Sequence, residues 1–123
     1  MITIDDAKKR ADESLVGFPE RIVNAYYSYA ESPDPVSLDV VVLGVLHFYL
    51  AKKPADALDA FPGGTRLVED LGVDSLTMMD TVFTVESLFE IKMEDAELPR
   101  ILTLDDLRQY LRRRTGLDAK SAL

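Results

Sequence analysis

Apolar residues recur every three or four positions along most of the chain, which is the pattern of helices that bury one face. The first helix is predicted to begin after Thr3, whose hydroxyl can cap it, and to end near Gly17. Pro19 suits the first turn of a second helix. The predicted buried faces are Ile4, Ala7, Ala11, Leu15 and Phe18 in the first helix, and Ile22, Tyr26, Tyr29 and Ala30 in the second. The chain is therefore expected to open with a helical pair.

A third helix is predicted from about Ser37 to Lys53, where Pro54 stops it. Its residues are apolar on nearly every side, whereas a helix at the outside of a small bundle keeps a polar face. Something must therefore cover its second face. We expect the N-terminal pair to do so, because short connections usually join spatial neighbours, and a second copy of the chain is the alternative. A monomer is accordingly expected rather than a dimer.

Residues 54–73 are predicted to form a long connection between this helix and the next. The apolar side chains expected to anchor it to the core are Leu58, Phe61, Leu67 and Leu71. The next helix is predicted from about Ser75 to Glu90. Its apolar side is expected to consist of Leu76, Met79, Val82, Phe83, Leu88 and Phe89, and its wet side to include Asp80 and Glu86.

Two further elements are predicted in the C-terminal part. A short helical turn covers residues 94–98 and ends at Pro99. A last helix begins after Thr103, which is followed three residues later by Asp106 as in a capping arrangement, and it ends before Gly116. Its buried stripe is expected to be Leu104, Leu107, Tyr110 and Leu111. The expected fold class is all-α.

The composition limits the chemistry that the chain can perform. Its 123 residues fit one domain, and 47% of them are hydrophobic, which argues against disorder. The sequence has no cysteine and a single histidine, His47. Disulfides, thiolate metal sites and a histidine-based catalytic centre are therefore disfavoured, and neither a metal site nor an enzyme is expected.

The formal net charge is −8, and residues 65–98 carry two basic and nine acidic side chains, a net charge of −7. This acidity argues against nucleic-acid binding and suits docking onto basic patches of other proteins. Residues 1–6 lack the layout of a secretory signal, and the most apolar run, residues 40–51, is too short to cross a membrane. We expect a soluble, cytoplasmic protein without a membrane span.

Ser75 is the strongest candidate for a functional residue. Gly72 permits a sharp turn just before the helix, and Asp74 can cap it, so that the Ser75 hydroxyl faces outward in the first turn. A phosphodiester on that hydroxyl would meet unpaired backbone N–H groups and the positive end of the helix dipole. The site is therefore compatible with a covalently attached phosphate, although the same residues also form an ordinary helix start.

The segment from Thr65 to Leu76, with the sequence TRLVEDLGVDSL, resembles the loop and modification motif of the acyl carrier protein family. Residues 77–89 are similar to the second helix of that family, residues 91–98 to its short third helix, and residues 102–111 to its last helix. The resemblance implies a four-helix acyl-carrier-like bundle over residues 35–115. Residues 1–34 would be an extension of two additional helices, and residues 116–123 a flexible tail.

The resemblance also implies a function and a set of site residues. Ser75 would receive a 4′-phosphopantetheine arm from coenzyme A through a phosphopantetheinyl transferase, with Asp74 positioning the transferase. The arm would carry acyl groups as thioesters to acyl-transferring or condensing enzymes of fatty-acid or polyketide type. Partner enzymes would grip Leu76, Met79, Asp80 and Glu86, and an acyl chain would contact Met79, Phe83, Ile91, Met93 and Leu98.

Several alternatives remain open. Asp74, where peptidyl carriers commonly have histidine, favours an acyl carrier, but an aryl or aminoacyl carrier of a non-ribosomal-peptide-like pathway is not excluded. A non-catalytic interaction protein could keep the fold without the arm, with Tyr26, Tyr27 and Tyr29 as an exposed anchor cluster, although packing against the third helix is the favoured interpretation of these tyrosines. A hydrolase that combines Ser75 with His47 is disfavoured, because no oxyanion hole or nucleophile elbow is recognisable.

Overall fold

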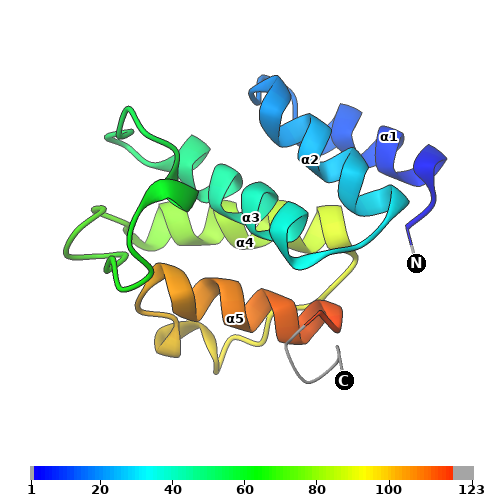
Figure 1. Ribbon diagram of the computed structural model, residues 1–123. Coiled ribbons are helices and arrows are strands. Elements are labelled where there is room, and N and C mark those ends of the chain that lie inside the picture. Colours follow the sequence, from blue (N-terminus) through cyan, green and yellow to red (C-terminus); the bar gives the residue numbers. More distant parts are fainter. Residues whose placement is uncertain (1, 118–123) are drawn as a thin grey trace.

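The computed structural model describes residues 2–117 and shows α-helices as the regular elements of that range (Figure 1). The α-helices are α1 (Ile4–Ser14), α2 (Glu20–Glu31), α3 (Pro35–Tyr49), α4 (Ser75–Phe89) and α5 (Leu104–Thr115), and two 3₁₀ helices are η1 (Leu58–Ala60) and η2 (Leu98–Arg100). The predicted all-α fold class is confirmed. Residues 118–123, in which most of the tail was expected, lie outside the described residues.

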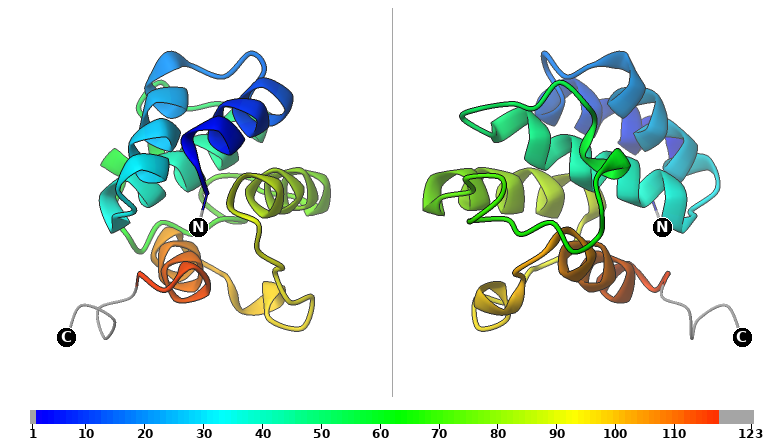
Figure 2. Two further views of the ribbon diagram at one scale, coloured as in Figure 1. Left: turned by 90° about the vertical axis from the view of Figure 1, so that its right-hand side faces the viewer. Right: turned by 60° about the vertical axis from the view of Figure 1, so that its left-hand side comes forward.

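The helices form three layers, with α3 and α4 in the middle (Figures 1 and 2). The α1–α2 pair packs on one side of this layer, and α5 packs against α3 on the other. Helix α3 contributes the largest set of buried apolar residues, which is Leu38, Val41, Val42, Leu43, Val45 and Leu46. The prediction that the N-terminal pair covers the second face of α3 is confirmed for α2, whereas α1 packs against α2 and α4.

Close packing joins α2 to α3, and hydrogen bonds join the pair to α4. A Cβ atom added at Gly44 would lie 2.2 Å from Cδ1 of Ile22, so the glycine allows the two helices to approach closely. The Tyr26 hydroxyl donates to the carbonyl oxygen of Leu88 at 2.6 Å. Arg10 of α1 pairs with Glu90 at the end of α4. Tyr26 and Tyr29 are buried, so these tyrosines pack in the core and form no exposed cluster.

Helix α3 differs from its predicted bounds at both ends. It begins at Pro35, because Asp34 caps it by accepting a hydrogen bond from the Ser37 N–H at 2.8 Å. It ends at Tyr49, four residues before the predicted Lys53. Leu50 leaves the helix with extended backbone, which keeps its side chain buried.

The C-terminal elements follow the prediction except at Pro99. This proline lies inside η2 and does not end the turn, because the start of a helix needs no N–H from that position. Helix α5 has the full capping box of Thr103 and Asp106, and Gly116 ends it with φ +79°. The predicted stripe Leu104, Leu107, Tyr110 and Leu111 is buried.

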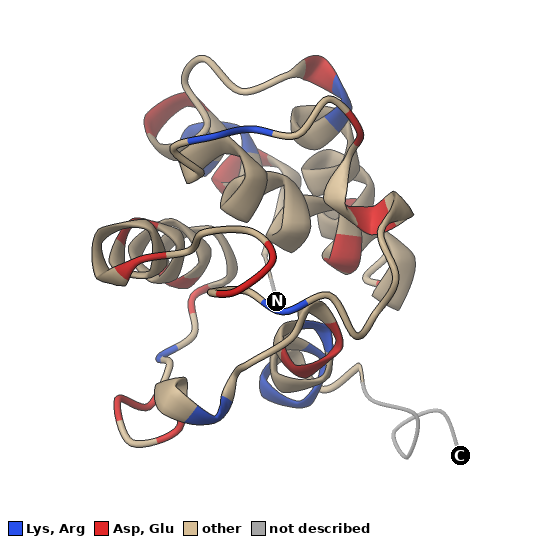
Figure 3. Cartoon of the chain, turned by 90° about the vertical axis from the view of Figure 1, so that its left-hand side faces the viewer, with Lys and Arg blue, Asp and Glu red and all other residues tan. Residues whose placement is uncertain are grey.

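Charge pairing between α3 and α5 was not predicted from the sequence. Asp39 of α3 pairs with Arg112 of α5 and lies 3.9 Å from Arg108. Figure 3 shows both basic and acidic segments on α5, which is seen nearly end-on. The contact joins α5 to α3 by charge in addition to the apolar packing between the two helices.

Candidate functional site

The start of α4 is built by a tightly bonded turn. Gly72 has φ +72°, a conformation that favours glycine, and its N–H donates to the carbonyl oxygen of Val68 at 3.1 Å. Val73 is buried and its N–H donates to the carbonyl oxygen of Leu67 at 2.9 Å. The turn therefore fixes where the helix begins, and Ser75 is its first residue.

Asp74 caps the helix as predicted. Its Oδ1 accepts a hydrogen bond from the Thr77 N–H at 2.8 Å, which holds the pKa of Asp74 below its usual value. Ser75 is exposed, with its side chain in the first helical turn. The helix extends for 15 residues behind it, so its dipole favours negative charge at this end. The geometry predicted for Ser75 and Asp74 is present.

A second carboxylate holds the loop before the turn. Asp70 Oδ2 accepts a hydrogen bond from the Arg66 N–H at 2.8 Å, and Asp70 Oδ1 lies 3.3 Å from the Arg66 guanidinium. The backbone hydrogen bond, followed by the side-chain bond, keeps the pKa of Asp70 low. The charge of Asp70 is therefore partly balanced within the loop.

The face that α4 buries is the main error of the sequence analysis. Leu76, Met79 and Phe83 were expected on the apolar side that packs inward, but they are 70%, 44% and 62% exposed. The residues that α4 buries are Thr77, Thr81, Val82, Thr84, Val85, Leu88 and Phe89. Helix α4 is thus rotated relative to the prediction, although Val82, Leu88 and Phe89 are buried as predicted, and threonines occupy part of its inner face.

The buried threonines are accommodated because their hydroxyls find partners. Thr81 donates to the Thr77 carbonyl oxygen at 2.8 Å, and Thr84 shares a hydrogen bond of 2.8 Å with the Tyr49 hydroxyl. The Thr77 hydroxyl reaches the carbonyl oxygen of Tyr49 at 3.4 Å. With these hydroxyls bonded, the methyl groups can pack against α3 at little cost.

The rotation leaves an exposed apolar stripe, Leu76, Met79 and Phe83, that begins next to Ser75. The stripe agrees with the partner-binding prediction for Leu76 and Met79, which remains a prediction. It contradicts the inward placement of Met79 and Phe83 as acyl-chain contacts, because both side chains face solvent. Of the other predicted acyl contacts, Met93 is buried and Ile91 and Leu98 are half-buried.

Glu86, predicted to meet partners, is engaged within the chain. Its Oε2 accepts a hydrogen bond from the Met93 N–H at 2.7 Å, and the next residue, Glu94, donates its N–H to the Tyr110 hydroxyl at 2.9 Å. These bonds hold the loop between α4 and η2. Asp80 is half-exposed on α4 and forms no such bond among the described residues.

His47 does not support the hydrolase alternative. Its Nε2 lies 2.8 Å from the carbonyl oxygen of Pro54, so the ring is held by the backbone that follows α3. The segment described, residues 2–117, contains no group of three or more side chains that could hold a metal ion. None of the helices in that segment is long and apolar enough to cross a membrane.

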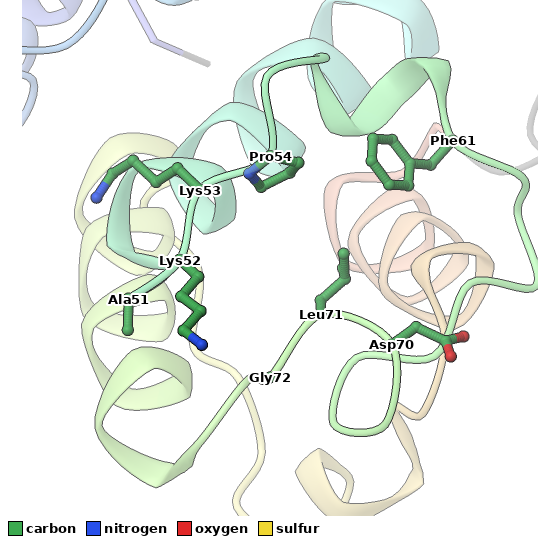
Figure 4. Close-up of a pocket in the computed structure, with 8 residues that line it drawn as sticks. All are labelled: Ala51, Lys52, Lys53, Pro54, Phe61, Asp70, Leu71 and Gly72. Atoms are coloured by element: carbon green, nitrogen blue, oxygen red, sulfur yellow. The ribbon is translucent and has the colours of Figure 1, made fainter.

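A cavity of about 610 Å³ lies beside the turn that precedes Ser75 (Figure 4). It is bounded by residues 51–54 and 70–72 and by Phe61. The cavity could not be predicted from the sequence, because its walls come from the two ends of the long connection between α3 and α4, which meet only in the fold. The adjacent lysines before Pro54 were the one local signal that could have drawn attention to it.

Comparison with known proteins gives a consistent result. No family model and no solved structure matches the chain. An acyl carrier protein of Thermotoga maritima is 41% identical over 51 residues, which are 42% of this chain and 63% of that protein. An acyl carrier protein of Desulforapulum autotrophicum is 32% identical over 60 residues, or 49% of this chain and 77% of that protein. An acyl carrier protein of Campylobacter fetus subsp. fetus is 33% identical over 55 residues, which are 45% of this chain and 71% of that protein.

The chain belongs to the acyl carrier protein family. Acyl carrier proteins are carriers and not catalysts, in agreement with the expectation that the chain is no enzyme. The similarity covers less than half of the chain, and the aligned residues span 63% of the length of the Thermotoga maritima protein. These similarities support an acyl-carrier role.

Proposed function

We propose that Ser75 carries a 4′-phosphopantetheine arm on which the protein holds acyl groups as thioesters. The observation that supports this most directly is the exposed Ser75 hydroxyl at the first position of the 15-residue helix α4, directly after the Asp74 cap. An N-terminus of this kind stabilises a phosphodiester through its unpaired N–H groups. The residues present therefore fit the group that membership in the acyl carrier protein family implies.

In the attachment step, the Ser75 oxygen forms a bond to the phosphorus that joins pantetheine to the nucleotide of coenzyme A. The bond from that phosphorus to the 3′,5′-bisphosphorylated adenosine breaks, and the serine proton passes to the transferase. The arm supplies a terminal thiol that forms thioesters with acyl groups. The chain itself holds Ser75 outward through Gly72 and Asp74 and leaves the chemistry to other enzymes.

The partner surface that we propose consists of Leu76, Met79 and Asp80, and we add Phe83 to it because its side chain is exposed on the same helix. Its occupants are the transferase and acyl-transferring or condensing enzymes of fatty-acid or polyketide type. Glu86 instead positions the loop that presents Ile91 and Met93, which together with Leu98 remain the proposed acyl contacts inside the bundle. Aryl and aminoacyl cargo stay as alternatives at the same serine.

The deciding experiment is the intact mass of the purified protein after incubation with coenzyme A, magnesium and a broad-specificity phosphopantetheinyl transferase. We expect a gain of one phosphopantetheine in the native chain, none in Ser75→Ala, and the full gain in Ser87→Ala, an exposed serine of the same helix. If the native chain gains nothing with a transferase proven on another carrier, and also nothing with a transferase from the same cell, the proposal is wrong. The exposed stripe on α4 would then belong to an interaction protein without the arm.

A further inference from the structure

A second cavity, of about 440 Å³, lies where the N-terminal pair meets the connection that follows α3. Its walls come from the start of α2 with the turn before it, from the C-terminal half of α3 and from residues 53–59. Much of the wall is apolar and includes Pro19, Ile22, Phe48 and Leu58. A volume in this range and a mostly apolar wall with a few polar groups are typical of small-molecule sites.

Two polar contacts hold the walls of this cavity together. Arg21 of α2 pairs with Asp59 of η1 at 2.5 Å, which joins the N-terminal pair to the connection. His47 of α3 also lines the cavity, and its Nε2 is held 2.8 Å from the carbonyl oxygen of Pro54. The cavity is therefore formed by contacts within the chain, and the charge of Asp59 is balanced by Arg21.

Lys53 gives this cavity a net positive charge. The residue borders both cavities, and Figure 4 shows its side chain directed away from the one beside Gly72. Its ammonium donates to the carbonyl oxygen of Leu50 at 3.0 Å, and two of its three N–H donors remain for a ligand. Among the ion pairs of residues 2–117, none includes Lys53. In a chain with a net charge of −8, this local charge favours an anionic ligand.

Leu58 contributes a buried donor to the same part of the wall. The residue is 1% exposed, and its backbone N–H has no acceptor among the described residues. Buried backbone N–H groups are nearly always paired with protein, water or a ligand. Lys53 and Leu58 both belong to the connection 53–59, so a ligand with a hydrogen-bond acceptor finds two donors on this side of the cavity.

We propose that this cavity is a non-covalent site for a small organic acid with a compact apolar body and one carboxylate. The body packs against Ile22, Phe48 and Leu58, and the carboxylate pairs with the Lys53 ammonium and accepts from the Leu58 N–H. The site does not depend on the proposed attachment at Ser75, because the described lining contains no residue of α4. A bound acid contacts α2, α3 and the connection at once and therefore stabilises their junction.

The test compares 2-naphthoate with 2-naphthamide, which has the same apolar body without the charge. The full chain, shown by intact mass to be unmodified, is titrated with each compound while its amide signals are recorded by NMR. Signals of residues 17–22, 44–48 and 55–59 report on this cavity, and those of residues 70–72 on the cavity beside Gly72. Urea unfolding with and without naphthoate measures the stabilisation, and the titration is repeated on a chain that carries the arm.

We expect naphthoate to give saturable shifts in the three lining segments, to move the Leu58 amide proton downfield and to raise the urea midpoint. Naphthamide should bind roughly two to five times more weakly, the range of one solvent-accessible ion pair, and Lys53→Gln should weaken naphthoate binding by the same factor. Lys53→Arg should keep the affinity because it keeps the charge. Lys52→Gln is the matched control, since it removes the same charge from the adjacent residue, which lines the other cavity.

Each other outcome overturns the proposal or a defined part of it. If neither compound gives saturable shifts, the cavity is no site for such a ligand. If both compounds bind equally, or Lys52→Gln weakens binding as much as Lys53→Gln, selection of a carboxylate by Lys53 is refuted. Shifts confined to residues 70–72, or an unmoved Leu58 amide, would place the ligand elsewhere. Binding that occurs only after the arm is attached would assign the site to the arm and refute an independent site.

Discussion

Single carboxylates at the two ends of α4 have different tasks. Asp74 holds the first turn by accepting the Thr77 N–H, and Glu86 holds the following loop by accepting the Met93 N–H. The cap was predictable because both partners lie three residues apart in one motif. The bond of Glu86 was not, since it depends on Glu90, which turns the chain with φ +55°, a conformation that sequence pattern does not reveal for glutamate.

Two substitutions of Asp74 separate the effect of its capping hydrogen bond from the effect of its charge. Asp74→Ala removes the acceptor of the Thr77 N–H and is expected to lower the urea midpoint, whereas Asp74→Asn keeps an acceptor and stays close to the native value at neutral pH. Because the folded-state pKa of Asp74 is lowered, its contribution to stability is present above its usual pKa and is lost as the pH falls through the lowered value. Urea unfolding at neutral pH and well below pH 3.8 measures both effects; an Asp74→Asn variant as unstable as Asp74→Ala at neutral pH would refute the role of the cap.

Tyr26→Phe tests the buried hydroxyl that reaches Leu88. The change leaves a carbonyl of the last turn of α4 without its partner, so we expect a loss of about 1–3 kcal/mol in the free energy of unfolding. Burial raises the pKa of Tyr26 to about 12, so its contribution to stability is complete below pH 10 and is lost as the pH rises from 10 through 12.

Urea titrations at neutral pH, repeated across this alkaline range, measure both effects. The variant should lose less stability than the native chain at high pH. Tyr27→Phe is the control, because Tyr27 is half-buried and its hydroxyl has no hydrogen bond among those described. Equal losses from the two variants would contradict the assignment.

Among the helices, hydrophobic spacing identified the buried faces of α2 and α5. In α4 it identified Val82, Leu88 and Phe89 correctly and misplaced Leu76, Met79 and Phe83. In α2 and α5 the apolar residues are the only ones that can pack, and they do. In α4 the inner positions are taken by Thr77, Thr81 and Thr84, and Leu76, Met79 and Phe83 face outward. The threonines can be buried because their hydroxyls are hydrogen-bonded, Thr84 to Tyr49 and Thr81 to the backbone of α4. The bond to Tyr49 joins segments that are distant in the sequence, so no local pattern predicts it.

Two alanine variants in α4 decide between the predicted and the observed face. Phe83→Ala is expected to change the free energy of unfolding by no more than about 0.5 kcal/mol, because the side chain is exposed. Leu88→Ala should cost about 2–5 kcal/mol, because that side chain is fully buried. Urea unfolding followed by circular dichroism measures both. A loss of several kcal/mol for Phe83→Ala would restore the sequence-based orientation of the helix.

The contact between α2 and α3 depends on the missing side chain at Gly44. Gly44→Ala places a Cβ atom 2.2 Å from Cδ1 of Ile22, so we expect a loss of about 1–3 kcal/mol from overpacking. Ile22→Val removes that Cδ1, and the double variant should therefore be less destabilised than the sum of the two single changes. Gly64→Ala is the control, since no atom lies within 4 Å of the added Cβ. Strict additivity in the cycle would show that the two residues do not meet.

At the scale of the molecule, one core joins the N-terminal pair to the rest. Buried residues of α1 and α2 belong to the same hydrophobic cluster as those of α3, α4 and α5. The division into residues 1–34 and 35–115 therefore remains a prediction from family resemblance. What the sequence did establish at this scale is that α3 needs a cover, because its apolar surface has no polar side to turn outward.

Removal of residues 1–34 tests whether the remainder is independent. The shortened chain exposes the face of α3 that α2 covers, so we expect self-association or loss of cooperative unfolding. Light scattering coupled to size exclusion, together with urea unfolding, distinguishes these results from the native chain. A monomeric, cooperatively unfolding fragment would instead establish residues 35–115 as a domain of their own.

The order of the helices also matters while the chain is being made. Helices α1 and α2 leave the ribosome before α3, the element that is apolar all round, and α2 is the helix that packs against it. Chains begin to fold from their N-terminal end during synthesis. Helix α3, which is apolar on nearly every side, therefore emerges when α2 is already available to cover one of its faces, and its other contacts form once α4 and α5 have been made.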